Sequence, residues 1–331
     1  MRHAVIIFTT VALISLTGTA SLMAPKPKAN LRIELFFKNT NELTQRIQFL
    51  SSKGVKAFNL VNKSNKDDIK HWVDVIREEI PDSDICAHYS LKYNKSRKKD
   101  GAFILFSEFV ESMHSSDDNG EVFSVDGKNE ILLITGSGPK GNLDSVLALE
   151  RLQNRGKYLN ESALDSSARM ATIAVAARMA TIAVAYNPFF PSKEELEIEQ
   201  ERLMKKIAMK QVSKIYLQFG TDLERLRSSL DWLSKLRQEH TDLSICGSIF
   251  LPTKKLIAQQ KFRPWNGVFL SEEFLDSEDG ARGIILQMMR LYEDYGCEIL
   301  IEAPGVRDTK DMALVEALLH DRDADHHTAG T

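Results

Sequence analysis

The chain has 331 residues, a formal net charge of −3 at pH 7 and 43% hydrophobic residues. Its length allows a large buried core, and its lysines and arginines are spread along the sequence instead of forming the basic face that nucleic-acid binding requires. We therefore expect no nucleic-acid partner. The three cysteines (Cys86, Cys246 and Cys297) are an odd number at wide spacings, which favours buried thiols over a disulfide framework or a metal site.

The first thirty residues differ from the rest. Arg2 and His3 precede an apolar stretch over 4–16 and small residues over 17–20, the order found in a secretory signal. The apolar part is shorter than the ~20 residues of a membrane span, so we expect a targeting leader at 1–30 and no stable span after its removal. Ala20 to Pro25 resembles the leader junction of proteins imported into complex plastids, which favours a plastid or another organelle. A simple signal peptide and a misassigned start, with a cytosolic protein, are the alternatives.

Eight short apolar runs, separated by stretches with helical patterning, follow the leader. Such alternation is typical of βα units, and eight units in ~250 to 300 residues predict one closed (β/α)8 TIM barrel over residues 31–320. The expected strands are Leu31 to Phe37, Val55 to Val61, Asp84 to Ser90, Glu130 to Gly136, Thr181 to Asn187, Lys214 to Gly220, Leu243 to Phe250 and Cys297 to Ala303.

Helices are expected between these strands. Ser192 and Glu195 form a Ser-x-x-Glu capping box at the start of the clearest one. The expected helices cover 40–52, 67–80, 103–113, 143–152, 193–209, 223–237, 254–260, 281–295 and 309–319. We expect a polar loop at 115–128 and a disordered polar tail at 321–331.

Residues 168–176 (ARMATIAVA) are repeated without change at 177–185. Only one copy can form the fifth strand. The second copy leads directly into Tyr186 and Asn187 at a strand exit, so we assign the strand to it.

In a β/α barrel the reactive groups lie at the carboxyl ends of the strands. Glu34, among apolar neighbours in the first strand, fits either a general acid near neutral pH or a buried structural carboxylate. His88 in the third strand fits a satisfied core histidine better than a metal ligand, since no second histidine has ligand spacing. Gln218 and Glu302 are the polar residues at the exits of the sixth and eighth strands.

The fourth strand has the one glycine-rich exit, from Thr135 to Gly141. Its small residues would let backbone amides approach a phosphate or a flat cofactor ring. We therefore count Thr135 and Ser137 as candidate cofactor-binding residues, and His88 of the third strand is a separate candidate. Arg307, after the eighth strand, is a candidate for binding a substrate carboxylate, with a surface ion pair as the alternative.

These segments together resemble the methylenetetrahydrofolate reductase family of flavin-dependent β/α barrels. Residues 33–37 (IELFF) are similar to Phe-Glu-Phe-Phe, residues 87–90 (AHYS) to Pro-His-Leu-Thr, and residues 247–252 (GSIFLP) to Gly-Ile-Leu-Pro. Residues 185–191 and 217–219 match the strand-five and strand-six exits of the family. The resemblance covers about residues 31–319.

The resemblance implies a role for each matching residue. Glu34 matches the general acid and Gln218 a folate-contacting residue, while Tyr186, Lys206 and Glu199 match flavin-contacting positions. The chain departs from the family after strand four, where an arginine and an aspartate are absent, and it has Phe190 and Val61 where the family has His and Thr.

The resemblance thus implies an oxidoreductase of one-carbon metabolism and methionine biosynthesis. NAD(P)H would reduce bound FAD, and the flavin would pass hydride to a methylenetetrahydrofolate-like substrate. Because of the departures we keep two alternatives: a non-catalytic barrel that acts as a binding or regulatory module, and a barrel enzyme acting on another phosphorylated ligand. A homo-oligomer is among the partners we consider.

Overall fold

The computed structural model describes residues 31–96, 98, 100–114, 129–135, 143–154, 181–302 and 306–328, with side chains through Arg322. Eight parallel strands close into one barrel in chain order, and β8 pairs with β1. The predicted (β/α)8 barrel is therefore confirmed. The strands are β1 (Leu31–Leu35), β2 (Ala57–Leu60), β3 (Asp84–Ser90), β4 (Asn129–Ile134), β5 (Thr181–Tyr186), β6 (Val212–Leu217), β7 (Ser244–Ile249) and β8 (Glu298–Ile301).

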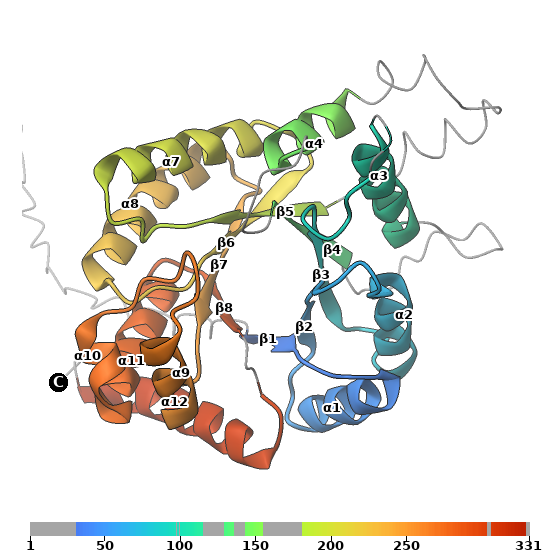
Figure 1. Cartoon of the computed structure of the whole chain (residues 1–331). Coiled ribbons are helices and arrows are strands. Elements are labelled where there is room, and N and C mark those ends of the chain that lie inside the picture. Colours follow the sequence, from blue (N-terminus) through green and yellow to red (C-terminus); the bar gives the residue numbers. More distant parts are fainter. Residues whose placement is uncertain are drawn as a thin grey trace, which may run out of the picture.

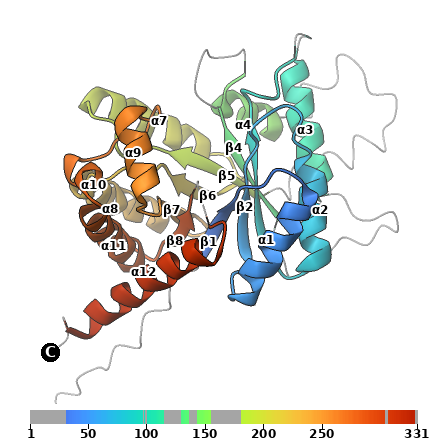
Figure 2. The ribbon, with the colours of Figure 1, turned by 60° about the horizontal axis from the view of Figure 1, so that its bottom comes forward.

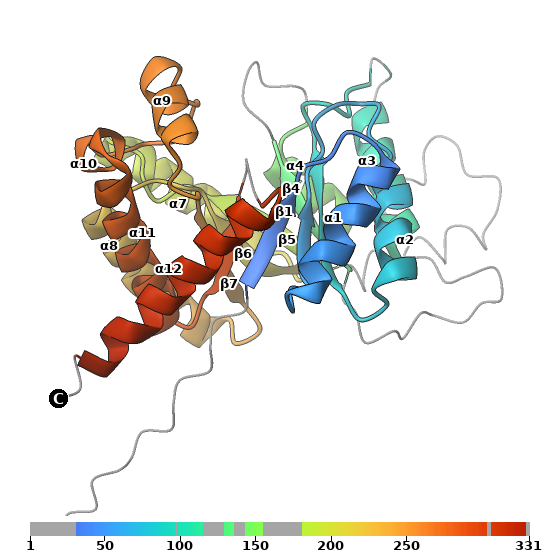
Figure 3. The same cartoon turned by 90° about the horizontal axis from the view of Figure 1, so that it is seen from below.

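Helices form a ring around the strands (Figure 1). They are α1 (Thr40–Ser52), α2 (Ile69–Glu79), α3 (Gly101–His114), α4 (Ser145–Gln153), α7 (Lys193–Ile207), α8 (Leu223–Glu239), α9 (Lys254–Phe262), α10 (Glu272–Asp276), α11 (Glu278–Asp294) and α12 (Thr309–Thr328). Short α10 was not anticipated. Figure 3 shows α9, which follows β7, standing out from the ring.

Local sequence signals explain where these elements begin. The Ser192 hydroxyl accepts a hydrogen bond from the Glu195 amide at 3.1 Å and donates to the Glu195 carboxylate at 3.0 Å, so the capping interaction expected for α7 is present. Strand β5 begins at Thr181, within the second copy of the duplicated segment, as predicted. The leader, the loop at 115–128 and the first copy at 168–176 lie outside the described residues.

The apolar core has two parts. The larger part lies between the strands and the helices and includes Ile33, Leu35 and Ile301. The smaller part lies inside the barrel and consists of Cys86, Leu132, Ala183, Tyr216, Cys246 and Leu300. All three cysteines are buried and unpaired, as expected for thiols that pack as small hydrophobes.

The end of the chain differs from our expectation. Helix α12 continues to Thr328 through most of the segment that we expected to be a disordered tail (Figure 2). Arg322 is 2% exposed and forms an ion pair with Glu293 of α11 at 3.3 Å. Burial of Arg322 and its ion pair with α11 favour continuation of this polar sequence as helix. None of the helices in the described part of the chain combines the length and hydropathy needed to cross a bilayer.

Candidate active site at the carboxyl ends of the strands

The inner surface of the barrel is polar at both ends. Successive residues of a strand face opposite sides, and Ile33 and Leu35 belong to the outer core, so Arg32 and Glu34 of β1 both point into the barrel. Arg32 is fully buried near the amino ends of the strands, and Glu34 is 8% exposed near the carboxyl ends. We call these two ends the floor and the mouth.

Two carboxyl residues lie at one level of the mouth. Ile33 of β1 and Ile301 of β8 are register partners, so the next residues, Glu34 and Glu302, lie at the same level on neighbouring strands. Leu300 belongs to the inner layer, which places Glu302 on the inner side as well. The Glu302 amide donates to the Ile249 carbonyl at 2.9 Å, so regular strand pairing extends to this residue.

The carboxyl group of Glu302 is suited to exchanging a proton at neutral pH. Burial raises its pKa to about 7, and the hydroxyl of nearby Ser248 opposes this rise. The Ser248 oxygen is buried and makes no hydrogen bond of normal geometry within the described part of the chain. A carboxyl group whose pKa is close to the ambient pH is an effective general acid or base.

A cation lies beside this pair. The Nζ of Lys63, in the loop after β2, is 3.5 Å from the centroid of the Phe36 ring, just after β1. Burial lowers the pKa of Lys63, and the charge of Glu34 opposes that effect. The mouth therefore holds two carboxyl groups and an ammonium group whose ionisation depends on Glu34.

His88 of β3 also faces the mouth, and hydrogen bonds through Asn59 connect it to Arg32 at the floor. Its Nε2 lies 3.1 Å from Nδ2 of Asn59 in β2, and Asn59 Oδ1 accepts a hydrogen bond from Arg32 Nε at 3.0 Å. Burial, together with the charge of Arg32, lowers the pKa of His88 to about 3. His88 is therefore a neutral side chain at physiological pH.

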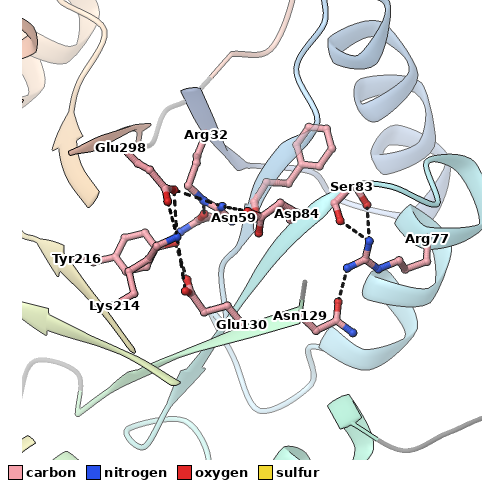
Figure 4. A network of polar contacts seen from close by, with 11 residues as sticks. Arg32, Asn59, Arg77, Ser83, Asp84, Asn129, Glu130, Lys214, Tyr216 and Glu298 are labelled. Carbon is pink, nitrogen blue, oxygen red and sulfur yellow. Dashed lines mark hydrogen bonds and ion pairs between the residues drawn. The ribbon is translucent and has the colours of Figure 1, made fainter. Parts of the chain in front are cut away.

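Buried charges at the floor form one network (Figure 4). Arg32 pairs with Asp84 at 2.9 Å and Glu298 at 3.6 Å. Lys214 pairs with Glu298 at 2.9 Å and Glu130 at 3.6 Å. The Tyr216 hydroxyl donates to Glu130 at 2.8 Å. Each charge of the network has an opposite partner, so removal of one member would leave another uncompensated at this end.

Three of the residues expected to contact flavin lie outside the barrel. The Tyr186 ring is buried against Trp232 of α8, with centroids 5.6 Å apart. The Lys206 ammonium donates to the Ala185 carbonyl at 2.8 Å, and burial lowers its pKa. Glu199 accepts from the Asn187 amide at 3.3 Å. These side chains connect β5 to α7 and α8, and they are not brought together with Glu34.

The remaining candidates are placed as follows. Half-buried Gln218 follows Tyr216 by two residues, so it lies on the inner side near the mouth. Thr135 Oγ1 accepts from the Ser145 amide at 3.2 Å at the start of α4, which gives it a structural role. Arg307 pairs with Asp311 of α12 at 2.9 Å, the surface ion pair that we had kept as the alternative. Ser137 lies outside the described residues.

Sequence reasoning did not assign a site role to Asn59, Lys63, Ser248 or Glu302. The sequence placed Glu302 at the exit of the eighth strand. Closure of the barrel, which makes β8 the neighbour of β1, could have indicated that Glu302 lies beside Glu34. Lys63 lies in a polar loop with no distinguishing motif. Among the described residues, no group of three His, Cys, Asp or Glu side chains is arranged to hold a metal ion.

The chain was compared with family models, curated sequences and solved structures. No protein-family model and no curated protein sequence matches the chain. Among solved structures, an uncharacterised Clostridium thermocellum protein that binds two copies of 5-methyl-5,6,7,8-tetrahydrofolic acid is 10% identical, with a TM-score of 0.53, and the match covers 89% of this chain and 95% of that one.

Two further structures have lower TM-scores. DHPS from Yersinia pestis with a pterine-sulfa conjugate is 14% identical, with a TM-score of 0.44 and coverage of 91% of this chain and 94% of that one. A GH99 endo-alpha-mannosidase from Bacteroides thetaiotaomicron is 13% identical, with a TM-score of 0.47 and coverage of 83% and 70%. At 10% identity, the match to the Clostridium thermocellum protein shows a shared fold alone.

Proposed function

We propose that this barrel is an enzyme that binds a folate-like small molecule at the mouth and transfers a proton to it from the carboxyl pair Glu34 and Glu302. The observation that carries the proposal is the position of these two side chains at one level of neighbouring strands, with the pKa of Glu302 raised to about 7. Such pairs occur where acid and base chemistry is performed.

Burial of Glu302 supplies the mechanism. Loss of hydration opposes ionisation of this carboxyl group, so with a pKa of about 7 it is present in both protonated and ionised forms at neutral pH. Transfer of this proton to a ligand nitrogen leaves both groups ionised beside the Lys63 ammonium, and the pair then stabilises the positive charge formed on the ligand. The proton returns from water in a later step.

The folate-like ligand is supported by two independent likenesses. In the resemblance of the strand exits to methylenetetrahydrofolate reductases, Glu34 and Gln218 match positions that act on folate in that family. The Clostridium thermocellum barrel binds 5-methyltetrahydrofolate. The pterin part of such ligands carries N–H groups, for which carboxylates are suitable acceptors.

Titration calorimetry of the purified full-length protein with 5-methyltetrahydrofolate tests the ligand. We expect binding that weakens in Glu34→Gln and Glu302→Gln and is unchanged in Glu201→Gln, an exposed control on α7. Absence of binding by the folded wild-type protein would refute the ligand class. Equal binding by all four proteins would refute the role of the carboxyl pair and leave a binding module.

Flavin-dependent reduction of a methylenetetrahydrofolate-like substrate is a narrower proposal, favoured by the position of Glu34 at the exit of β1. The described residues do not fit FAD well: Tyr186, Lys206 and Glu199 are occupied by contacts outside the barrel, and Thr135 accepts a hydrogen bond from the first residue of α4. We therefore derive no step through flavin.

An absorption spectrum tests this narrower proposal. The full-length protein is incubated with FAD and recorded before and after desalting. Retained visible flavin bands, together with NAD(P)H oxidation that depends on the folate substrate, would support a flavoprotein. Complete loss of the bands from a folded preparation would exclude one.

A further inference from the structure

The hydrogen bonds between Arg32, Asn59 and His88 have only one consistent arrangement of donors and acceptors. A guanidinium group has no acceptor, so Arg32 Nε must donate to the Asn59 side chain, and the atom 3.0 Å away is the amide oxygen. The opposite end of the amide, 3.1 Å from His88 Nε2, is then the NH2 group. Because an amide NH2 only donates, His88 Nε2 must be the acceptor.

This arrangement determines the tautomer of His88. An imidazole that accepts at Nε2 and is neutral carries its proton on Nδ1. Protonation of Nε2 would place its N–H group against the NH2 group of Asn59, two donors facing each other near the charge of Arg32. Burial and that charge also lower the pKa of His88 to about 3, so the imidazolium is absent at neutral pH.

Arg32 is itself held in place from several sides. Its Nη1 pairs with Asp84 at 2.9 Å and with Glu298 at 3.6 Å, and its Nη2 donates to the Phe58 carbonyl at 3.2 Å. Arg32 and Asn59 are both fully buried. The guanidinium cannot turn away without breaking these contacts, so the orientation of Asn59 is fixed by the floor of the barrel.

The other ring nitrogen is available to a ligand. Asn59 is the register partner of Cys86, two residues before His88, so the Nε2 lone pair points toward the floor. Across an imidazole ring the Nδ1–H bond points away from that lone pair. No residue in the described part of the chain accepts a hydrogen bond from Nδ1, and His88 is 7% exposed.

We propose that Arg32 and Asn59 hold His88 as the neutral Nδ1–H imidazole, so that a ligand at the mouth meets a hydrogen-bond donor and places an acceptor, a carbonyl oxygen or an unprotonated ring nitrogen, against it. Arg32 and Asn59 are positioning residues, and His88 determines specificity. The ligand part rests on the proposed function, whereas the tautomer does not.

Long-range 15N–1H correlation spectra of the full-length protein labelled with 15N-histidine test the tautomer. His88→Gln identifies the signals of His88 by their loss. We expect the neutral Nδ1–H pattern, without titration between pH 5 and 8. An Nε2–H pattern, or a titration within this range, would overturn the proposal.

Asn59→Asp provides the matched variant, since it keeps the size and the acceptor for Arg32 but removes the NH2 group. The carboxylate would accept from His88, so we expect the proton to move to Nε2 and the pKa of His88 to rise. A folded Asn59→Asp protein with the wild-type pattern would contradict the role of Asn59. The wild-type spectrum decides the tautomer even where this variant fails to fold.

Binding of 5-methyltetrahydrofolate tests the ligand part. We expect His88→Phe to weaken binding about tenfold through the lost hydrogen bond, and His88→Gln, which retains a donor, to weaken it less. Equal affinity of wild type and His88→Phe would overturn the recognition role. A folded wild type that binds no folate would refute the proposed function, and the spectra would still decide the tautomer.

Discussion

The Lys214 ammonium lies 2.9 Å from the Glu298 carboxylate, although β6 and β8 are separated by β7. The two side chains meet because both point into the barrel at its floor. The Lys214 side chain is 7% exposed, and Glu130 lies 3.6 Å away on its other side. The pKa of Lys214 is raised despite its burial, because the two carboxylates outweigh the loss of hydration.

Removal of this cation should destabilise the barrel. We expect Lys214→Met to lower the free energy of unfolding by about 3 kcal/mol, because it leaves two buried carboxylates with less positive charge between them. Urea unfolding followed by circular dichroism measures the change. The exposed ion pair of Lys193 with Glu197 offers a control, and Lys193→Met should cost less than about 0.5 kcal/mol.

A second substitution separates charge from packing. Glu298→Gln removes one of the carboxylates left by Lys214→Met, so the double variant should be more stable than the sum of the two single effects. Strict additivity would mean that the pair contributes through packing and not through charge.

His88 should make the stability of the protein depend on pH. Its pKa is lowered from 6.5 to about 3, so between these values the unfolded chain binds a proton that the folded chain does not. The contribution of His88 to the free energy of unfolding therefore falls as pH falls, by about 2 kcal/mol between pH 7 and pH 5.

Replacement of His88 removes this dependence. In urea unfolding experiments, we expect the difference in free energy of unfolding between wild type and His88→Gln to change by about 2 kcal/mol between pH 7 and pH 5. His320→Gln, on an exposed position of α12, should leave the wild-type pH dependence intact. A constant difference between wild type and His88→Gln would show that the imidazole takes up a proton as readily in the folded barrel as in the unfolded chain.

Ionisation of Glu302 should lower the stability of the protein as pH rises, which is opposite to the effect of His88. Its pKa is raised from 4.5 to about 7, so its contribution to stability is fully present below pH 4.5 and is lost as pH rises through 7. Glu302→Gln, which cannot ionise, should therefore increase the free energy of unfolding at pH 8 by about 1–2 kcal/mol and change it little at pH 4. The range allows for partial exposure of the side chain.

Unfolding midpoints at pH 4, 6 and 8 would measure the trend. Glu201→Gln, which replaces an exposed carboxylate, should show no such trend. A variant that is destabilised equally at all three values would mean that the Glu302 carboxylate makes structural contacts that the amide cannot replace.

The strands could be predicted from sequence because burial on both faces leaves long apolar runs. The floor network could not. Its charged members stand near the starts of strands, where a polar residue is the ordinary boundary of an apolar run, and only closure of the barrel brings them together. Arg32 and Glu298 carried a signal, since each is a charged residue just inside an apolar run.

The candidate site was predicted in part. Glu34, His88 and Gln218 lie on the inner side of strands, at the end where barrel enzymes bind ligands. Tyr186 was assigned to the site from the resemblance, but Ala185, its neighbour, pairs with the inward-facing Tyr216. Strand alternation therefore turns Tyr186 toward α8, and only the register of β5 against β6 reveals this.

Packing of β7 against α11 depends on the absence of a side chain at Gly247. A Cβ there would overlap the ring of Tyr292, whose hydroxyl donates to the Ser248 carbonyl at 3.2 Å. We expect Gly247→Ala to lower the free energy of unfolding by about 1–3 kcal/mol, because the buried ring has no room to move.

Gly283→Ala is the control, since a Cβ at this α11 position meets nothing within 4 Å. Alanine there should stabilise the helix by up to about 1 kcal/mol, and urea unfolding of both variants would show opposite signs. Equal effects would mean that α11 shifts to accommodate the added methyl group at Gly247.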